Sequence, residues 1–361
     1  MTKNNHFKNF LKKIYYKYFK ARENLPIIKS KNTNKKRKIF NIIGGDLNKD
    51  KIFYIIQRYP GLGLFSNLTF VVNHIRIAEN MGFIPIVDMQ NYPTIYNEKE
   101  KILNTFNSWE YYFEQVSKYS LEEVYSSKNV IITDNTFYSN IDFDYNITDK
   151  SELVEIFKKY IKLNKFKTKT INYLRHKLFK NKKILGVHFR GTGYKYFRNP
   201  YPLTINQMIN KINEILKNED YEKIFVMTED KKNFDALIDY YGSKIIHLET
   251  SLRGKNTYEV YDKYPRSRHR YKIGRNVVFE TYLLSYCDGF FDIETNPATI
   301  VHALNLNPNQ KRYTFNNGFN NSWPIFNQFK YTWHIKSFLP ESLGGFKHNK
   351  KPIKKNKKKP I

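Results

Sequence analysis

The sequence contains one cysteine, Cys287, in 361 residues. A single thiol cannot form a disulfide within the chain, and it cannot supply the thiolates of a zinc ribbon or an iron–sulfur cluster. No window of eighteen residues is uninterruptedly apolar, so no segment is predicted to cross a bilayer as a helix. The N-terminus also lacks the apolar stretch of a secretory signal. These absences favour a reducing, cytoplasmic setting.

Acidic residues are scarce, since 33 Asp and Glu face 62 Lys and Arg, which gives a net charge of +29. Residues 1–40 carry a net +12 and residues 347–361 a net +8, which leaves +9 on the 306 residues between them. The two ends are therefore expected to contact something anionic. Abundant Lys, Asn, Ile and Tyr also indicate a bias toward AT-rich codons, which would explain part of the charge without a partner.

The N-terminal segment, residues 1–40, contains an apolar stripe at helical spacing with lysines off the stripe. The stripe consists of Phe7, Phe10, Leu11, Ile14, Tyr15, Tyr18 and Phe19. Such a helix suits an anionic membrane surface, and it equally suits packing on the body of the protein with solvated lysines. Nucleic-acid binding is less favoured, because the aromatics form one stripe and no stacking groove. The tail, residues 347–361, has no core-forming residues and is predicted to be disordered. It could add a second electrostatic contact with the same anionic partner.

Between these ends, the chain alternates short apolar strands with helical patterns. Expected strands are 52–56, 83–87, 129–133, 184–189, 224–228, 244–248 and 289–293, and expected helices are 64–81, 149–180, 204–217, 231–241, 275–286 and 297–304. This alternation predicts parallel, doubly wound sheets. The fold class is therefore α/β, with two Rossmann-like domains facing a cleft, in residues 41–175 and 176–346. A hydrophobic content of 40% with 17% aromatics supports well-packed cores.

Polar clusters follow three strands of the second domain, where open α/β sheets bind ligands. His188, Arg190 and Thr192 follow the first strand, and an arginine fork beside a hydroxyl suits a phosphate or pyrophosphate. Alternation along the strand puts His188 and Arg190 on one face and Phe189 on the other. The simpler, structural interpretation of this cluster is a surface arginine beside a histidine whose hydrogen bonds are made within the protein.

The next two clusters have capping as their simplest role. Glu229 and Asp230 could accept hydrogen bonds from a base or ribose, or only cap the following helix. Glu294, Thr295 and Asn296 follow the last strand. Asn296 is the expected N-cap there, and the exposed amides of that turn could also bind phosphate.

Two further segments are candidates for binding an anion. The run from Arg266 to Arg275 holds five cations in ten residues and could line a cleft for an acidic donor or acceptor, although a solvated loop is its default interpretation. Gly61 and Gly63 form a glycine loop before the first long helix.

Several familiar site patterns are absent or weak. The glycine loop departs from G-x-G-x-x-G, because Ser66 occupies the third glycine position, and a Walker A loop is missing. Asp142-Phe-Asp144 matches a D-x-D pattern but lies in a stretch rich in Asn and Asp, where a turn is expected. No His, Cys and carboxylate spacing indicates a metal site, so no metal is expected.

Together these blocks resemble the GDP-fucose-dependent fucosyltransferases related to α1,6-fucosyltransferases, nodulation fucosyltransferases and protein O-fucosyltransferases. The matching blocks are His188-Phe-Arg190-Gly-Thr192, Thr228-Glu229-Asp230, Leu283 to Phe290 with the turn Thr295-Asn296-Pro297, and the loop Gly61-Leu-Gly63. They are scattered over residues 52–310. Gly193 stands where the family has an aspartate, Glu229 replaces an aspartate, and the final turn lacks the family's serines.

The resemblance implies a GT-B fold, a GDP-sugar donor held mostly by the C-terminal domain, and inverting transfer without a metal. The donor-binding residues would be Gly61, Gly63, His188, Arg190, Thr192, Glu229, Asp230, Arg275, Thr295 and Asn296. Arg190 and the amides at Thr295 and Asn296 would stabilise the diphosphate leaving group. A carboxylate must take the acceptor proton. The candidates for this base are Asp88, Glu110, Glu280 and Glu294.

The leading hypothesis is a glycosyltransferase that adds fucose or another GDP-sugar residue to a bacterial surface glycan, such as a lipopolysaccharide or capsule. The basic N-terminal segment would bring it to a lipid-linked acceptor on the inner face of the cytoplasmic membrane. One alternative is a basic nucleic-acid-binding protein. Another is a transferase relative that binds GDP-sugar without turnover, which the substitution at Gly193 would explain.

Overall fold

The computed structural model describes residues 40–42, 45–133, 151–191, 200–263, 265–293, 295–319 and 329–352. The chain divides into two compact units, Met1–Asn164 and Lys165–Ile361, about ten residues before the expected boundary at 175. The division assigns the whole of helix α5 (Lys165–Phe179) to the second unit, where Phe179 joins a core cluster with helix α8 (His269–Tyr286). The expected N-terminal stripe and the Asp142–Asp144 turn lie outside the described residues.

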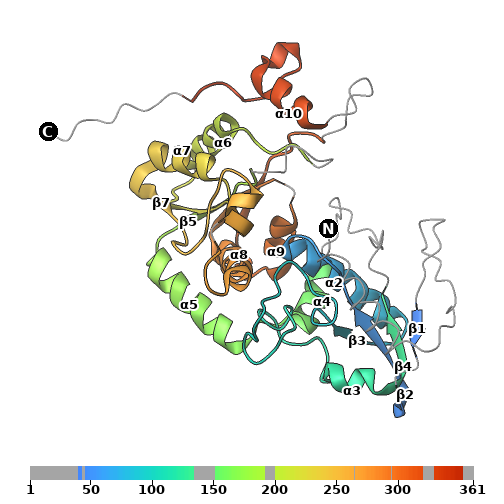
Figure 1. Cartoon of the computed structure of the whole chain (residues 1–361). Coiled ribbons are helices and arrows are strands. Elements are labelled where there is room, and N and C mark those ends of the chain that lie inside the picture. The colour runs from blue at the N-terminus through green and yellow to red at the C-terminus, as the bar shows by residue number, and fades with distance from the viewer. Residues whose placement is uncertain are drawn as a thin grey trace. The chain divides into compact units, whose positions relative to one another are not determined.

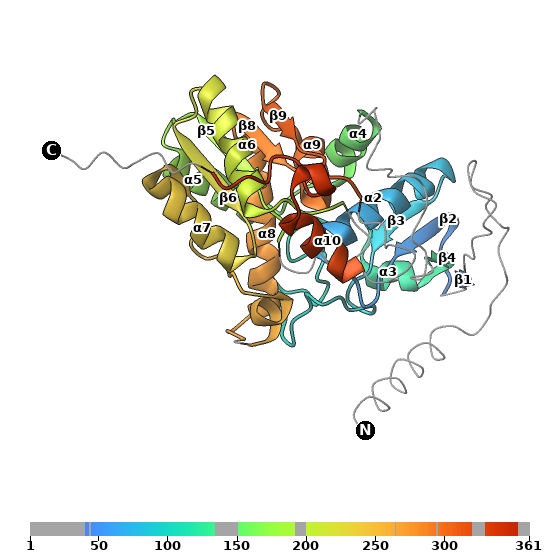
Figure 2. The same cartoon turned by 90° about the horizontal axis from the view of Figure 1, so that it is seen from above.

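The first unit is built around a sheet of four strands among the residues described. Its elements are β1 (Phe40–Ile42), β2 (Leu47–Ile56), α2 (Leu64–Asn80), β3 (Ile84–Val87), α3 (Leu121–Tyr125), β4 (Ser127–Ile132) and α4 (Ser151–Tyr160). The strand order is β1-β4-β2-β3, and Figure 2 shows these strands side by side. β2 pairs in parallel with β3 and β4, while β1 adds an antiparallel edge. The carboxyl half of β2 is a continuous apolar run that is buried on both faces, as expected for a central parallel strand.

The second unit contains a five-stranded, fully parallel sheet within the described part of the chain. After α5 its elements are β5 (Ile184–His188), α6 (Ile205–Asn218), β6 (Lys223–Met227), α7 (Lys231–Tyr241), η2 (Gly242–Lys244), β7 (Ile245–Ile246), η3 (Glu259–Lys263), α8 (His269–Tyr286), β8 (Gly289–Asp292), α9 (Asn296–Leu304), β9 (Lys311–Thr314), α10 (Phe329–Phe338) and η4 (Glu341–Leu343). The order β7-β6-β5-β8-β9 places the first and fourth strands of the unit side by side, as in a Rossmann sheet. The predicted α/β class with Rossmann-like sheets is confirmed.

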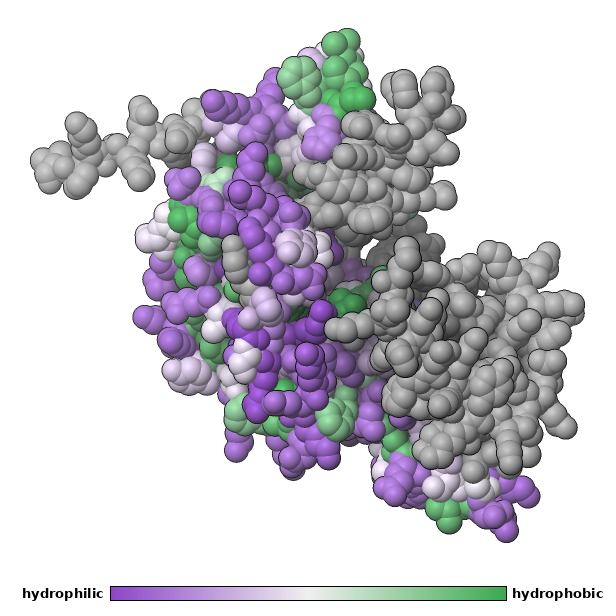
Figure 3. Space-filling model, in the orientation of Figure 1, coloured by the Kyte–Doolittle hydropathy of each residue, from purple (hydrophilic) through white to green (hydrophobic). Residues whose placement is uncertain are grey.

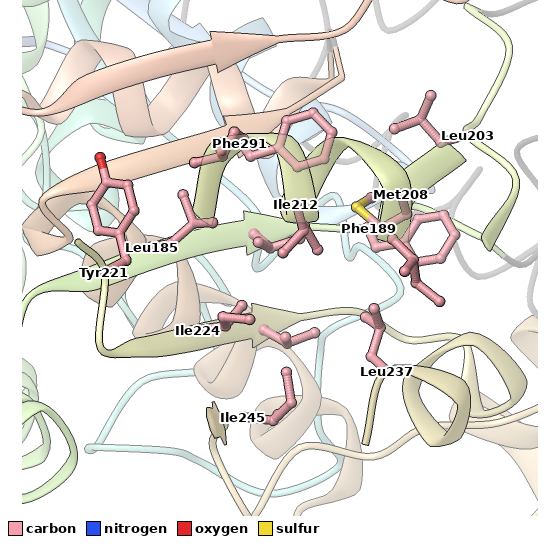
Figure 4. Packing of buried hydrophobic residues seen from close by; sticks show 14 of the residues in the cluster. Leu185, Phe189, Leu203, Met208, Ile212, Tyr221, Ile224, Leu237, Ile245 and Phe291 are labelled. Atoms are coloured by element: carbon pink, nitrogen blue, oxygen red, sulfur yellow. The ribbon is translucent and has the colours of Figure 1, made fainter. Parts of the chain in front are cut away.

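Helices cover both faces of this sheet (Figure 1). Leu185, Val187 and Phe189 point to the face covered by α6 and α7, where they pack with Ile212 and Leu237 (Figure 4). The alternate residues of β5 point to the face covered by α8 and α9. The sequence supplies this arrangement through apolar residues at helical spacing on α6 and through buried, mostly apolar segments on the central strands β5, β6 and β8.

Two expectations about local structure are wrong. Helix α8 begins at His269, six residues before the predicted start, so much of the basic run expected to be a loop is helical. The reason is that His269, Ile273 and Gly274 are buried and give this turn an inner face. Residues 347–350, expected to be disordered, are held by α6, because Asn210 Nδ2 donates to the carbonyl of Lys350 at 2.8 Å. Residues 353–361 lie outside the described part of the tail.

Replacing Ile212 by Ala is expected to lower the free energy of unfolding by about 2–5 kcal/mol, because it leaves a cavity between α6 and the sheet. Ile212 has no exposed surface. Chemical denaturation followed by circular dichroism measures this change. The matched control is Leu343→Ala, a residue that is 67% exposed and whose truncation is expected to cost less than about 0.5 kcal/mol. Equal effects of the two substitutions would contradict the assigned core.

Candidate active site

The candidate site lies at the carboxyl edge of the second sheet, where β5 and β8 are neighbours. The chain leaves β5 toward α6 on one face and leaves β8 toward α9 on the other, which makes this the topological switch point. His188, the last residue of β5, meets Thr295, the residue directly before α9. The distance from His188 Nδ1 to Thr295 Oγ1 is 3.1 Å, and both side chains are buried. The N-terminus of α9 is thereby fixed beside the end of β5.

Thr295 is the N-cap of α9, one residue earlier than the expected Asn296. Its hydroxyl oxygen accepts a hydrogen bond from the Ala298 amide at 3.3 Å, and Pro297 fills an early helical position that needs no donor. A capping threonine with a buried imidazole partner holds this helix end more firmly than capping alone. Phosphate groups are favoured at such an end by the helix dipole and the first amides.

Burial lowers the pKa of His188 to about 4, so the imidazole is neutral at pH 7. In the tautomer with its proton on Nε2, the neutral ring accepts at Nδ1 from the Thr295 hydroxyl. Because the unfolded chain binds this proton near pH 6.5, the contribution of His188 to stability is complete above pH 6.5. It is lost as the pH falls toward 4. His188 therefore acts as a neutral hydrogen-bonding group.

Arg190 and Glu229 form an ion pair across the ends of β5 and β6, with 3.5 Å between Arg190 Nη1 and Glu229 Oε1. The arginine side chain is 42% exposed and the glutamate 22% exposed, so the pair lies at the surface of the sheet edge. Gly191 follows directly and must be glycine, because a Cβ there would lie 2.5 Å from Asp230 Oδ2. Asp230 caps α7 by accepting from the Asn233 amide at 3.0 Å. The structure thus brings together His188, Arg190, Glu229, Asp230 and Thr295.

Glu280 lies in the interior of α8 and is buried behind this edge. Arg253 Nη2 is 3.9 Å from Glu280 Oε1, and the two side chains are 9% and 5% exposed. The Arg253 guanidinium stacks on the Phe234 ring at 3.8 Å from its centroid. Burial raises the pKa of Glu280 to about 7, while Arg253 opposes the rise and Glu229 adds to it. The influence of Glu229 places Glu280 in the same electrostatic neighbourhood as Arg190.

Sequence reasoning missed Arg253. It lies in a loop between β7 and η3, and no strand end or glycine pattern precedes it. Its one local signal is Gly254, whose amide donates to the Glu229 carbonyl at 3.0 Å. This bond ties the loop to Glu229, two residues after the end of β6, and only the folded chain reveals it.

In the first unit, the glycine loop is held by the start of α2. Gly61 has φ +76°, a conformation that favours glycine, and Gly63 is the N-cap of α2. Asn67 Oδ1 accepts from the Leu62 amide at 2.8 Å, and its Nδ2 donates to the Leu62 carbonyl at 3.2 Å. Arg58 donates to the Ser66 carbonyl beneath the loop. The loop is therefore a shaped helix N-terminus, a geometry suited to an anion.

The candidate bases Asp88 and Glu110 hold their own loops together. Asp88 is fully buried and accepts from the Gln90 and Asn91 amides, the Asn91 side chain and the Tyr125 hydroxyl. Glu110 accepts from the side chains of Thr105, Asn107 and Gln115. Its aromatic neighbours are buried core residues: Trp109, Tyr111, Tyr112 and Phe113.

The remaining candidates lie elsewhere. Arg275 on α8 donates to the Asn276 side chain at 3.0 Å and contributes to lowering the pKa of the buried Lys167, which burial brings to about 8. The contacts of Arg275 do not include His188 or Arg190 among the described residues. Thr192 and Glu294 lie outside the part of the chain that the structure describes. Within that part, no group of three or more His, Cys, Asp and Glu could hold a metal ion.

No family model matches the sequence, and no curated protein matches it. Solved structures similar to the chain include NodZ α-1,6-fucosyltransferase soaked with GDP-fucose, with 17% identity, a TM-score of 0.44, and coverage of 70% of this chain and 93% of that chain. POFUT1 in complex with GDP-fucose is 10% identical with a TM-score of 0.44, covering 74% and 99%. A mutant of Arabidopsis thaliana FUT1 in complex with GDP is 9% identical with a TM-score of 0.41, covering 79% and 75%.

Glu280→Gln is expected to change how stability depends on pH. The folded carboxyl has a pKa of about 7 against 4.5 for the ordinary group, so the folded state binds more protons between these values. Ionisation of Glu280 therefore destabilises the wild type as the pH rises from 4.5 to 7, and glutamine removes this effect. Between pH 4.5 and 8, the difference in unfolding free energy between variant and wild type should shift in favour of the variant by on the order of 3 kcal/mol.

Urea denaturation at both pH values measures this difference. Glu249→Gln, at an exposed position, is the control and should follow the wild type within about 0.5 kcal/mol at either pH. A Glu280→Gln variant that parallels the wild type across the range would mean that the carboxyl titrates outside it.

Proposed function

We propose that this chain is a glycosyltransferase that moves fucose from GDP-fucose to a hydroxyl of a bacterial surface glycan, such as a lipopolysaccharide or capsule. The observation that carries the proposal is the edge of the second sheet. There, an arginine, a firmly capped helix N-terminus and a buried carboxylate–guanidinium pair lie around one switch point. This combination suits a nucleoside diphosphate. The choice of fucose rests on the sequence blocks around His188, Glu229 and Thr295.

The diphosphate would be bound by Arg190 and the N-terminus of α9. As the glycosidic bond to the sugar breaks, negative charge develops on the leaving diphosphate. A guanidinium and a helix N-terminus stabilise that charge without a metal ion, because both are positioned before the reaction begins. The bond between His188 and Thr295 keeps the helix end in place. Arg190 is oriented by Glu229.

Glu280 and Arg253 would recognise the base. The edge of guanine presents two N–H donors beside a carbonyl acceptor. A carboxylate accepts from such donors, and a guanidinium donates to the carbonyl. Glu280 and Arg253 present these two functions 3.9 Å apart in a buried setting. Glu280, considered from the sequence as a catalytic base, therefore becomes a contact for the nucleotide, and the burial of its carboxyl supports this change of role.

An inverting transfer requires a carboxylate to take the proton of the attacking hydroxyl. Asp88 and Glu110 use their oxygens within their own loops. The carboxylate proposed for this role is Glu294, because its sequence neighbours Ile293 and Thr295 belong to the switch point. The acceptor would be lipid-linked and met at the inner face of the cytoplasmic membrane through residues 1–40. In the described part of the chain, no helix is long and apolar enough to span a bilayer.

Arg190→Ala is expected to abolish stabilisation by nucleotide. A ligand at one hundred times its dissociation constant adds about 2.7 kcal/mol to the folded state. GDP and GDP-fucose should therefore raise the melting temperature of the wild type, and the variant should melt normally but show no rise. Thermal shift with GDP, GDP-fucose, GDP-mannose, UDP-GlcNAc, NAD and a short DNA duplex measures this. Arg175→Ala, another exposed arginine of the second unit, is the control and should respond as the wild type.

The outcomes separate three functions. Stabilisation by GDP-fucose with release of GDP on addition of acceptor supports the transferase. Stabilisation without turnover across an acceptor panel indicates a GDP-sugar-binding relative. A shift with DNA alone, retained in Arg190→Ala, indicates a nucleic-acid-binding protein and contradicts the proposal.

Deleting residues 1–40 is expected to weaken binding to anionic vesicles, since the deletion removes the apolar stripe and a net charge of +12. Co-sedimentation with phosphatidylserine-containing vesicles measures the bound fraction. Vesicles of phosphatidylcholine alone are the control, and neither protein should bind them strongly. Equal binding of both proteins to the anionic vesicles would show that this segment does not contact the membrane.

A further inference from the structure

The C-terminal end of the second unit displays a group of apolar side chains to solvent. Phe338 is 89% exposed, Leu343 67% and Ile335 45%. They lie on α10 and η4, and the green area at the top of Figure 3 lies over α10. Single exposed apolar residues are ordinary, but three on one short helix and the turn after it form a patch. We call these three residues the α10 patch.

The inner side of this element is firmly packed, so the α10 patch is held outward. Trp333 Nε1 donates to the Pro202 carbonyl at 2.8 Å. Phe346 is buried, with its ring 5.2 Å from that of Tyr201. Lys336 Nζ donates to the Gly344 carbonyl at 2.8 Å and fixes the turn through η4. Because these aromatics occupy the inner face, the patch cannot turn inward without unpacking them.

A lysine-rich segment begins beside the α10 patch. Asn349 Nδ2 donates to the Ser337 carbonyl at 2.6 Å, next to Phe338 in the sequence. Asn210 on α6 binds the carbonyls of His348 and Lys350. The exposed Lys350 and Lys351 therefore directly follow a residue that is hydrogen-bonded next to Phe338. Residues 329–361 contain ten lysines and one acidic residue, Glu341.

We propose that the α10 patch and the exposed lysines Lys347, Lys350 and Lys351 form a docking surface for an anionic lipid bilayer. Phe, Leu and Ile side chains enter the boundary between headgroups and acyl chains, while lysines attract acidic headgroups; stable peripheral binding needs both signals. A nucleic acid would also attract the lysines. However, two of the three apolar side chains are aliphatic and cannot stack on bases. This surface adds a structured contact to the one proposed for residues 1–40, and it does not depend on nucleotide binding.

The test places an environment-sensitive fluorophore at the patch in the full-length chain. Ser342→Cys, between Phe338 and Leu343, is exposed and can be labelled with NBD, while Cys287 is buried and burial raises the pKa of its thiol. With vesicles containing about 30% phosphatidylserine, the NBD emission should shift to the blue and rise several-fold. Vesicles of phosphatidylcholine alone should produce little change. Asn172→Cys, exposed on α5, is the control position and should not respond.

Adding Phe338→Asp and Leu343→Asp to the labelled chain should reduce its apparent affinity for anionic vesicles, read from NBD, at least tenfold. Tyr173→Asp, a 63% exposed residue on α5, should leave it unchanged. Arg190→Ala should also leave it unchanged, so a failure of the nucleotide proposal is distinguishable from a failure of this one. Three results would overturn the proposal: no NBD response to anionic vesicles, a response unaffected by the two aspartates, or an equal response to a DNA duplex without lipid.

Discussion

A fully parallel sheet must be covered on both faces, and the candidate site of the second unit depends on this requirement. Residues of β5 alternate between two helical layers. Leu185, Val187 and Phe189 pack under α6, while Ile184, Gly186 and His188 face α8 and α9. The last side chain of β5 is therefore delivered to the layer that contains the start of α9. Because all five strands point the same way, the polar residues that follow β5, β6 and β8 gather at one edge.

Much of this edge could be predicted from the sequence, since it depends on local order. Strand alternation assigned Phe189 and His188 to opposite faces, and both assignments are confirmed. The strand ends also identified Arg190, Glu229 and Thr295 as neighbours. What the sequence could not supply were contacts between distant segments. Arg253 reaches Glu280 through a loop that backbone hydrogen bonds tie to the segment after β6, and no periodicity encodes such a bond. The predicted start of α8 was too late. The first turns of this helix contain several cations between their few buried residues, so the sequence shows no clear apolar stripe there.

Burial shifts the pKa values of His188 and Glu280, two titratable groups beneath the edge, in opposite directions. It keeps His188 neutral at pH 7 and brings Glu280 close to half ionisation. In both cases burial disfavours the charged form. The buried side of the edge keeps the charge of Arg253 beside Glu280, and the exposed side presents Arg190, paired with Glu229, and the end of α9. A diphosphate would therefore meet its charge partners at the surface, while a base would be recognised at depth through hydrogen bonds.

The pair between Arg190 and Glu229 is better explained by positioning than by stability. Exposed ion pairs contribute about 0–1 kcal/mol, and 3.5 Å between half-exposed groups is a loose contact. A guanidinium has five donors in a planar fork, so one carboxylate contact orients it while using a fraction of its hydrogen-bonding capacity. Glu229 is itself fixed, because the Gly254 amide holds its carbonyl. The loop that carries Arg253 toward Glu280 thus also fixes the residue that orients Arg190. The contacts proposed for the base and for the diphosphate would in this way depend on one backbone connection, which couples the two halves of the proposed donor site.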